Sequence, residues 1–343
     1  MPELGGAAVP GTSTAPAPAA RWVSYILVGF GVAILVLFAA TTNFRQLGAA
    51  LREVRPGLLG LAAGALVLQI LAKAVRWQYM IRRLTGTVIS LRFAAISIIA
   101  GVAAGSIAPA RSFEMAKAML LKGSHGTTLT VSTSAMIVER MLDIVLMIGA
   151  LLLAGLLLPR RMMLTSGALL VMMAALVGGS ALAVAAPLSM RAWASRIIRI
   201  VPGPAGLRRR GLRLVDTLFE SILVWRRGRT LGLLLVFTAL STCFDVARVC
   251  AMFWGMGVAF SAPFLIFTYT GAAMLGMALL VPGGVGVTEV SQVGLITLLA
   301  PGGASAVLVR SSVLVDRFLS YYLLVFVGAM LLVAYHRFRH AFH

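Results

Sequence analysis

Acidic residues are scarce in this sequence. Asp and Glu together number 10, against 30 Lys and Arg in a chain of 343 residues, so the formal net charge is +20. Charged residues make up only 12% of the chain, whereas hydrophobic residues make up 60% and the mean hydropathy is +0.98. This composition cannot supply the polar surface of a water-soluble domain. Apolar runs of the ~20 residues that cross a bilayer recur at 22–41, 57–80, 131–158 and 231–253, which predicts an all-α polytopic membrane protein.

Cysteine and histidine are also rare, which bears on catalysis and cofactors. Cys243 and Cys250 lie seven residues apart on one helix face, so they cannot form a disulfide with each other. His125 is isolated and the other histidines lie near the C-terminus, so no metal-ligand spacing exists. The glycine cluster at 283–286 is not followed by the Lys-Ser/Thr of a nucleotide-binding loop. We therefore expect no enzyme activity, no metal site and no cofactor.

The excess of basic residues is interpreted as a membrane feature and not as a nucleic-acid interface. Basic residues that flank apolar helices orient the chain and bind anionic headgroups. The interval 191–229 carries ten arginines, which predicts a cytoplasmic position for it. Within it, residues 212–225 have an apolar and a charged face, as expected either of an interfacial helix or of a water-exposed helix packed on its own protein.

One transmembrane domain with short tails is expected. Residues 1–20 are rich in Ala, Gly and Pro and lack the basic and apolar regions of a signal peptide, so they are expected to be a disordered tail. The other expected boundaries are a transmembrane domain at 21–335, its halves at about 57–158 and 230–335, a joining segment at 159–229 and a basic tail at 336–343.

Four polar features of the first half return in the second half at a nearly constant spacing, which indicates an internal repeat. The pairs and their offsets are Arg76 and Arg248 (172 residues), Pro109 and Pro282 (173), Glu114 and Glu289 (175), and Glu139-Arg140 and Asp316-Arg317 (177).

Each half also contains an interrupted apolar region, at 90–122 and at 262–300, broken at Ala108-Pro109 and at Pro282-Gly283-Gly284 respectively. If both regions are re-entrant helical hairpins, six full spans remain, both termini are cytoplasmic and the halves form an inverted repeat, as in many transporters. The alternative is eight full spans with parallel halves. The six full spans are expected at 22–41, 57–81, 127–158, 162–187, 230–257 and 304–335.

Six of the ten acidic residues fall in or beside apolar segments, and arginines accompany them. A carboxylate at the bilayer centre costs on the order of 2.5–3.5 kcal/mol on insertion scales, so each needs a partner or water. One interpretation is a polar cavity whose arginines bind a lipid phosphate through bidentate hydrogen bonds. The other is a set of ion pairs that fix helix packing. The candidate substrate-binding residues are Arg76, Arg111, Glu114, Glu139, Arg140, Asp143, Asp245, Arg248, Pro282, Gly283, Gly284, Gly286, Glu289, Arg310, Asp316 and Arg317.

The two breaks have a chemistry of their own. Pro109 and Pro282 end the helices before them, and the glycines after Pro282 allow a turn without side-chain bulk. The helix N-termini that follow such breaks attract anions. Irregular backbone at membrane depth is tolerated only where it is buried in protein or lines a water-filled cavity. The alternative is a tight interhelical turn at the surface.

Several motifs together resemble the lysylphosphatidylglycerol synthase transmembrane, or flippase-like, family, which includes the membrane half of the bacterial multiple-peptide-resistance factor. The motifs are Pro109-x-Arg111-x-x-Glu114, Glu139-Arg140-x-x-Asp143, the segment PGGVGVTE at 282–289 and Asp316-Arg317, and the resemblance covers roughly 20–335. It implies movement of a lipid between the leaflets of a bacterial inner membrane. The soluble aminoacyl-transferase domain of fused members has no counterpart here, so synthesis of lysyl-lipid is not implied. Phe113 stands where the family often has Gly.

Two hypotheses from different classes follow. In the first, the chain is a lipid flippase or scramblase whose polar cavity takes the headgroup of an anionic or aminoacylated phospholipid, or of a polyprenyl-phosphate-linked lipid. In the second, it is a non-transporting membrane partner or regulator of a lipid- or glycan-modifying enzyme. A membrane-embedded transferase is disfavoured because the sequence lacks a carboxylate-rich metal motif.

Overall fold

The computed structural model describes residues 54–107, 113–127, 129–159, 228–278, 281–300 and 305–337, together with single positions between 191 and 216. Every regular element in these ranges is helical. The helices expected at 22–41 and 162–187 lie outside the described residues, as do most of 212–225, the tail 1–20 and all but the first two residues of the tail 336–343.

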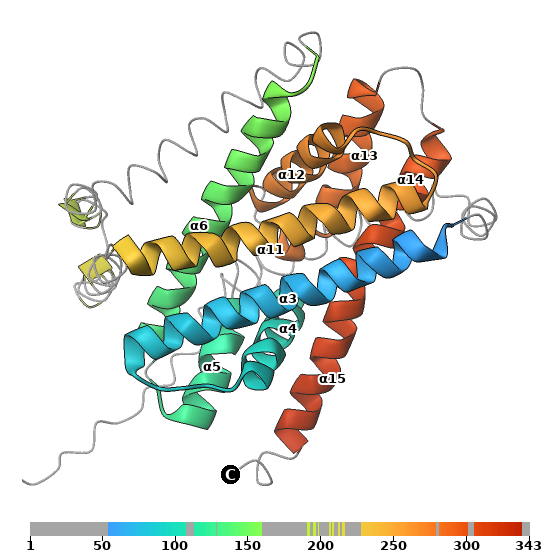
Figure 1. Ribbon diagram of the computed structural model, residues 1–343. Helices are drawn as coiled ribbons and strands as arrows, with labels where there is room; N and C mark the ends of the chain where they lie inside the picture. Colours follow the sequence, from blue (N-terminus) through green and yellow to red (C-terminus); the bar gives the residue numbers. More distant parts are fainter. Residues whose placement is uncertain are drawn as a thin grey trace, which may run out of the picture.

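Two long helices, α3 (Pro56–Thr85) and α11 (Gly228–Gly255), lie side by side and antiparallel through the middle of the molecule (Figure 1). Proline at its first position favours the start of α3, and Gly86 ends it in a left-handed conformation with φ 73°. The backbone N–H of Arg55 donates to the carbonyl of Gly255 at 3.0 Å, so the start of α3 meets the end of α11. A Cβ at Gly255 would lie 3.3 Å from that of Leu58, so glycine allows this close approach.

Each half also contains a pair of shorter helices, and these bracket the breaks expected from the sequence. In the first half they are α4 (Leu91–Ile107) and α5 (Phe113–His125), and the residues between them are not described. In the second half they are α12 (Ala262–Ala278) and α13 (Val287–Leu299), with the short helix η1 (Pro282–Gly284) between them.

The second break has the glycine conformations that its sequence predicts. Gly283, Gly284 and Gly286 have φ values of 62°, 65° and 78°, a region that other residues rarely adopt. A Cβ on Gly283 would collide with the hydroxyl of Tyr321, so this position excludes a side chain for steric reasons as well.

A fourth long element closes each half. It is α6 (Leu129–Leu156) in the first half and α14 (Ala306–Arg317), η2 (Phe318–Tyr322) and α15 (Leu323–Arg337) in the second. The sequence predicted one uninterrupted helix at 304–335, whereas η2 is a π-helical turn that begins directly after Arg317. Such a turn inserts an extra residue and rotates the helix that follows, and π-turns are frequent at functional sites.

The contacts of the two halves correspond element by element. In each half the short helices pack on each other, the second of them packs on the fourth element, and the first helix packs on the fourth. Across the halves, α4 packs against α15 and α12 packs against α6 (Figure 1). Each half therefore completes the packing of the other, and the two form one unit.

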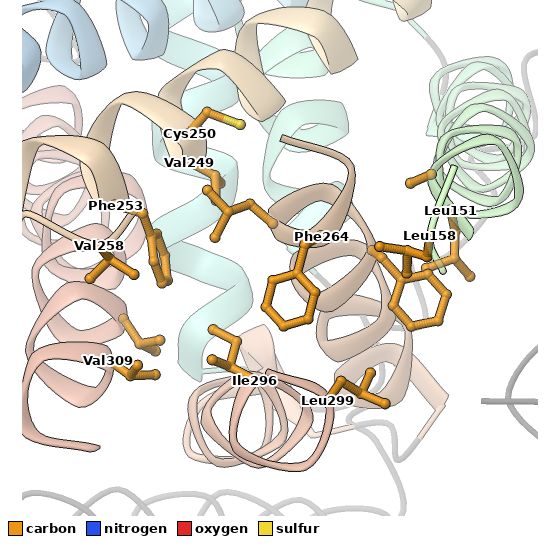
Figure 2. Close-up of a cluster of buried hydrophobic side chains, with 14 of the residues drawn as sticks. Leu151, Leu158, Val249, Cys250, Phe253, Val258, Phe264, Ile296, Leu299 and Val309 are labelled. Atoms are coloured by element: carbon orange, nitrogen blue, oxygen red, sulfur yellow. The ribbon is translucent and has the colours of Figure 1, made fainter. Parts of the chain in front are cut away.

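Apolar side chains fill the interior and also cover much of the outside. One buried cluster joins α6, α11, α12, α13 and α14, with Phe253, Phe264 and Ile296 among its members (Figure 2). A second joins α3 to α6 around Trp77. Many large apolar side chains point outward instead, including Leu298 at 76% exposed and Val333 at 65%. A soluble protein would not present so much apolar surface, but lipid tails accept it.

Three of the described helices are long and apolar enough to cross a membrane, namely Pro56–Thr85, Gly228–Gly255 and Ala306–Ala334. The chain is therefore a multi-pass helical membrane protein.

Replacement of Gly328 by Ala tests the packing between the two halves. A Cβ at Gly328 would lie 2.8 Å from that of Ala103 and would collide with the carbonyl of Ile99 in α4. We expect Gly328→Ala to destabilise the fold by about 1–3 kcal/mol, as overpacking does, and to lower the melting temperature in detergent. The matched control is Gly64→Ala in α3, where a Cβ meets nothing within 4 Å, and it should not lower the melting temperature. Equal melting of both variants would contradict the crossing of α4 and α15 described here.

Candidate functional site

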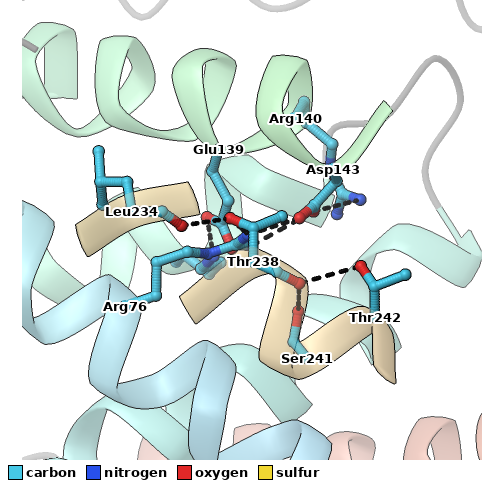
Figure 3. A network of polar contacts seen from close by, with 9 residues as sticks. Arg76, Glu139, Arg140, Asp143, Leu234, Thr238, Ser241 and Thr242 are labelled. Carbon is cyan, nitrogen blue, oxygen red and sulfur yellow. Dashed lines mark hydrogen bonds and ion pairs between the residues drawn. The ribbon is translucent and has the colours of Figure 1, made fainter. Parts of the chain in front are cut away.

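Arg76 is the centre of a buried ionic network in the first half. Its side chain is 0% exposed and lies where α3, α6 and α11 meet (Figure 3). Nη2 donates to Glu139 Oε1 at 2.8 Å, and Nη1 donates to Asp143 Oδ1 at 2.5 Å and to Thr238 Oγ1 at 2.8 Å. Glu139 and Asp143 are one helical turn apart on α6, so both carboxylates reach one guanidinium. Arg76 thus ties three helices together.

Lys117 of α5 completes this network. Its Nζ lies 2.8 Å from Glu139 Oε2 and 4.2 Å from the centre of the Trp77 ring. Glu139 therefore has a cation on each of its two oxygens, and the ammonium gains a further cation–π contact. The sequence analysis did not select Lys117, although its position three residues after Glu114 was the available signal.

A corresponding network surrounds Arg248 of α11 in the second half. Nη1 donates to Asp316 of α14 in a short contact, and Nη2 lies 2.9 Å from Asp245 Oδ1. The hydroxyl of Tyr269 on α12 donates to Asp245 Oδ2 at 2.8 Å. Arg248 is 1% exposed and Asp316 is 0% exposed. Three helices again meet at one arginine.

Arg317 belongs to a second contact group in this half. Its Nε donates to Glu289 Oε1 at 2.8 Å and its Nη2 donates to the Gly283 carbonyl at 3.1 Å. Tyr322 also donates to Glu289 Oε1, at 2.9 Å. Glu289 itself is 0% exposed. It thus holds an arginine at the glycine break from within the protein interior.

The two networks use corresponding positions for their central pair. Arg76 and Arg248 are 172 residues apart, Glu139 and Asp316 are 177 apart, and each arginine is paired with the carboxylate of its own half. The second carboxylate differs, because Asp143 lies on α6 whereas Asp245 lies on α11 beside Arg248. Lys73 occupies the position that corresponds to Asp245.

A cavity lies between the halves, in front of both networks. One part measures about 290 Å³ and an adjoining part about 240 Å³, and both are lined by Arg140, Asp245, Tyr269, Gly283 and Arg317. Lys73 and Arg248 also line the larger part, and Asp143 lines a smaller recess that shares Lys73, Arg140 and Asp245 with it. The wall therefore carries four basic against two acidic side chains, so its net charge favours an anion.

Two comparisons place the chain among known proteins. The family model described as the lysylphosphatidylglycerol synthase transmembrane region matches residues 22–328. The chain belongs to this family. A similar curated protein is a UPF0104 membrane protein of Methanothermobacter thermautotrophicus, which is 33% identical over 103 residues, a stretch that covers 29% of each chain. The match thus spans under a third of that relative's length.

Most candidate residues of this family member gather around the cavity in two layers. Those that line it are Arg140, Asp143, Asp245, Arg248, Gly283, Gly284 and Arg317. Those that lie behind the wall in the ionic contacts are Arg76, Glu139, Glu289 and Asp316.

The other candidates are placed less centrally or lie outside the described residues. Gly286 precedes α13, Pro282 begins η1, and Arg310 lies on α14 and is not among the lining residues of the cavity. Arg111 is outside the described residues, and of Glu114 only its place in α5 is described.

Sequence reasoning missed three side chains at the cavity or its networks besides Lys117. Lys73 and Tyr269 line the cavity, and Tyr322 bonds to Glu289. Lys73 could have been found, because it precedes Arg76 by one turn at the position of Asp245. The tyrosines had no signal of this kind, since their hydroxyls gain meaning only through the carboxylates that they reach.

The Arg248–Asp316 pair offers a direct test of the networks. Replacing Arg248 by Met leaves Asp316 charged in the protein interior, and breaking a buried pair in this way costs about 3–5 kcal/mol. We expect Arg248→Met to lower the melting temperature in detergent strongly, and the double variant with Asp316→Leu to recover much of it.

A control for this test is the more exposed pair of Arg191 and Asp216, whose side chains are 35% and 44% exposed. Arg191→Met should cost ~1 kcal/mol or less. If the double variant were no more stable than Arg248→Met, the burial of an unpaired charge would not be the cause of the loss.

Proposed function

We propose that the chain moves a lipid with an anionic headgroup between membrane leaflets through the cavity between its halves. The observation that carries this proposal is the wall of four basic and two acidic side chains at the meeting point of two helix pairs. Membership of a family named for a lysyl-lipid synthase supports a lipid as the substrate. The substrate classes that fit are an anionic or aminoacylated phospholipid and a polyprenyl-phosphate-linked lipid.

Arg140, Arg317 and Lys73 are the side chains assigned to phosphate in this proposal. Arg140 lies 3.8 Å from Asp143 and is 34% exposed, whereas Arg76 is fully enclosed by its hydrogen bonds. Arg317 is 12% exposed and lies beside the backbone of Gly283. A guanidinium presents parallel N–H donors that match two phosphate oxygens. Arg76 and Arg248 then serve to hold the wall, and not to take up the headgroup.

The two acidic side chains of the wall give the site a second specificity. Asp143 and Asp245 lie close to the basic groups and are accessible from the same cavity. They would attract the amine of an aminoacylated headgroup while the arginines bind its phosphate. The apolar outer surface allows acyl or prenyl chains to stay in the bilayer while the headgroup crosses. No catalytic step is assigned to the chain.

The membrane arrangement proposed here has six full spans and two re-entrant hairpins, with both termini in the cytoplasm of a bacterial cell. The helices α4 and α12 have 17 residues each, and α5 and α13 have 13 each. At 1.5 Å per residue their lengths are about 26 Å and 20 Å, less than the ~30 Å of a hydrocarbon core. Short helices that enter and return suit these lengths better than full crossings, and the antiparallel α3 and α11 suit an inverted repeat.

Leaflet exchange in proteoliposomes tests the proposal. Fluorescent phosphatidylglycerol is incorporated, and a membrane-impermeant quencher reports how fast the inner-leaflet lipid becomes accessible. We expect exchange by the wild type, and at least tenfold slower exchange for Arg140→Gln and for Arg317→Gln, because each removes a phosphate ligand from the cavity. Lysyl-phosphatidylglycerol and a fluorescent polyprenyl phosphate, run in parallel, distinguish the substrate classes.

The matched control is Arg92→Gln. Arg92 is exposed at the start of α4 and does not line the cavity, so its removal should leave the exchange rate unchanged. Exchange that survives in both cavity variants would refute the assignment of Arg140 and Arg317. A folded wild type that exchanges none of the three lipids would favour a non-transporting membrane partner of a lipid- or glycan-modifying enzyme.

A further inference from the structure

The two halves treat their central carboxylates differently. Both oxygens of Glu139 face a cation, because Arg76 lies 2.8 Å from Oε1 and Lys117 lies 2.8 Å from Oε2. Asp316 receives Arg248 on Oδ1, but its Oδ2 is buried and has no hydrogen-bond partner among the described residues. The second half therefore has one cation fewer at the corresponding carboxylate.

The residue that corresponds to Lys117 is Gln292. The offset of 175 residues between Glu114 and Glu289 pairs Lys117 with Gln292, and it also pairs Leu121 with Ile296. Leu121 and Ile296 are both 0% exposed and belong to the core clusters of their halves. The register of α5 and α13 is therefore equivalent on the buried face, and a neutral amide stands where the first half has an ammonium group.

Several buried polar atoms beside this position have no partner among the described residues. They are Gln292 Oε1 and Nε2, Asp316 Oδ2 and Ser311 Oγ, on the adjacent helices α13 and α14. Each of the three side chains belongs to a residue that is 0% exposed. Buried oxygens without a partner are unfavourable, so this set calls for a ligand that accepts oxygen lone pairs.

We propose that a sodium ion binds between α13 and α14, at the position that the ammonium group of Lys117 occupies in the first half. Its ligands are Asp316 Oδ2, Gln292 Oε1 and Ser311 Oγ. These are hard oxygen donors with a single negative charge, which suits a small monovalent cation. The ion restores the cation that Gln292 does not supply, and Asp316 then has positive charge on both oxygens as Glu139 does.

The proposed site also lies one helical turn from a wall residue of the cavity. Glu289 precedes Gln292 by three residues on the buried face of α13, and Glu289 holds Arg317. An ion between α13 and α14 would therefore steady the helix that positions Arg317. Binding of the ion itself does not depend on lipid transport, so the two proposals can fail separately.

The melting temperature of the purified chain in detergent provides the test. Sodium chloride is compared with N-methyl-D-glucamine chloride at equal ionic strength and pH. Sodium at tenfold its Kd should raise the wild-type melting temperature by roughly 2–4 °C, since it binds only the folded state. Potassium chloride in a third sample controls for unspecific salt effects.

Exchanging the corresponding residues sharpens the test. Gln292→Lys supplies a fixed ammonium group, so this variant should melt without sodium as the wild type does with it, and sodium should have no further effect. Lys117→Gln creates in the first half the arrangement of the second, so it should depend on sodium more strongly than the wild type. Ser311→Ala removes one ligand with little change in volume and should raise the sodium concentration of half-maximal effect about tenfold.

Three results would overturn the proposal. One is a wild-type melting temperature that is equal in sodium and N-methyl-D-glucamine. Another is a sodium response that survives unchanged in both Gln292→Lys and Ser311→Ala. The third is a melting temperature that follows pH but not sodium, which would assign the place to a proton on Asp316.

Discussion

The pairing of a buried arginine with a buried carboxylate is the constraint on which the rest of this structure depends. A guanidinium or a carboxylate removed from water must find an opposite charge and fill its hydrogen bonds, because several kcal/mol per ion are otherwise lost. Arg76 and Arg248 meet this demand with carboxylates from other helices. The helices α3, α6, α11 and α14 are therefore fixed to one another at two points, and the cavity lies between those points.

The broken helices follow from the same constraint. A spanning helix buries its own backbone groups but cannot bring a backbone carbonyl to a side chain at mid-depth. The turn at Gly283 does so, and its carbonyl accepts from Arg317 at 3.1 Å. The glycines at 283, 284 and 286 are needed for their backbone conformations, and Gly283 also for the space that Tyr321 occupies. Break and arginine are thus parts of one arrangement, which the π-turn after Arg317 extends into the next helix.

Much of this arrangement could be predicted from the sequence, for a physical reason. Charges are so unfavourable in apolar segments that each one marks a constraint, and the equal spacing of Arg76 and Arg248 relative to Glu139 and Asp316 pointed to the pairs. The glycine break was visible because few residues tolerate positive φ. The partners Lys73 and Tyr269 could not be chosen in the same way, because helix rotation decides whether they face the cavity. The π-turn had no sequence signal, since it arises from packing around Arg317.

Equal folds with unequal charges give the two halves different chemistry. Lys73 corresponds to Asp245 and Lys117 corresponds to Gln292, so two basic positions of the first half are acidic or neutral in the second. The helices that carry these residues make equivalent contacts, hence the exchange alters the electric field and leaves the framework intact. A site built from such halves has a positive side and a more acidic side. A zwitterionic headgroup that enters it meets an orientation preference, and that preference comes from four residues and not from the fold.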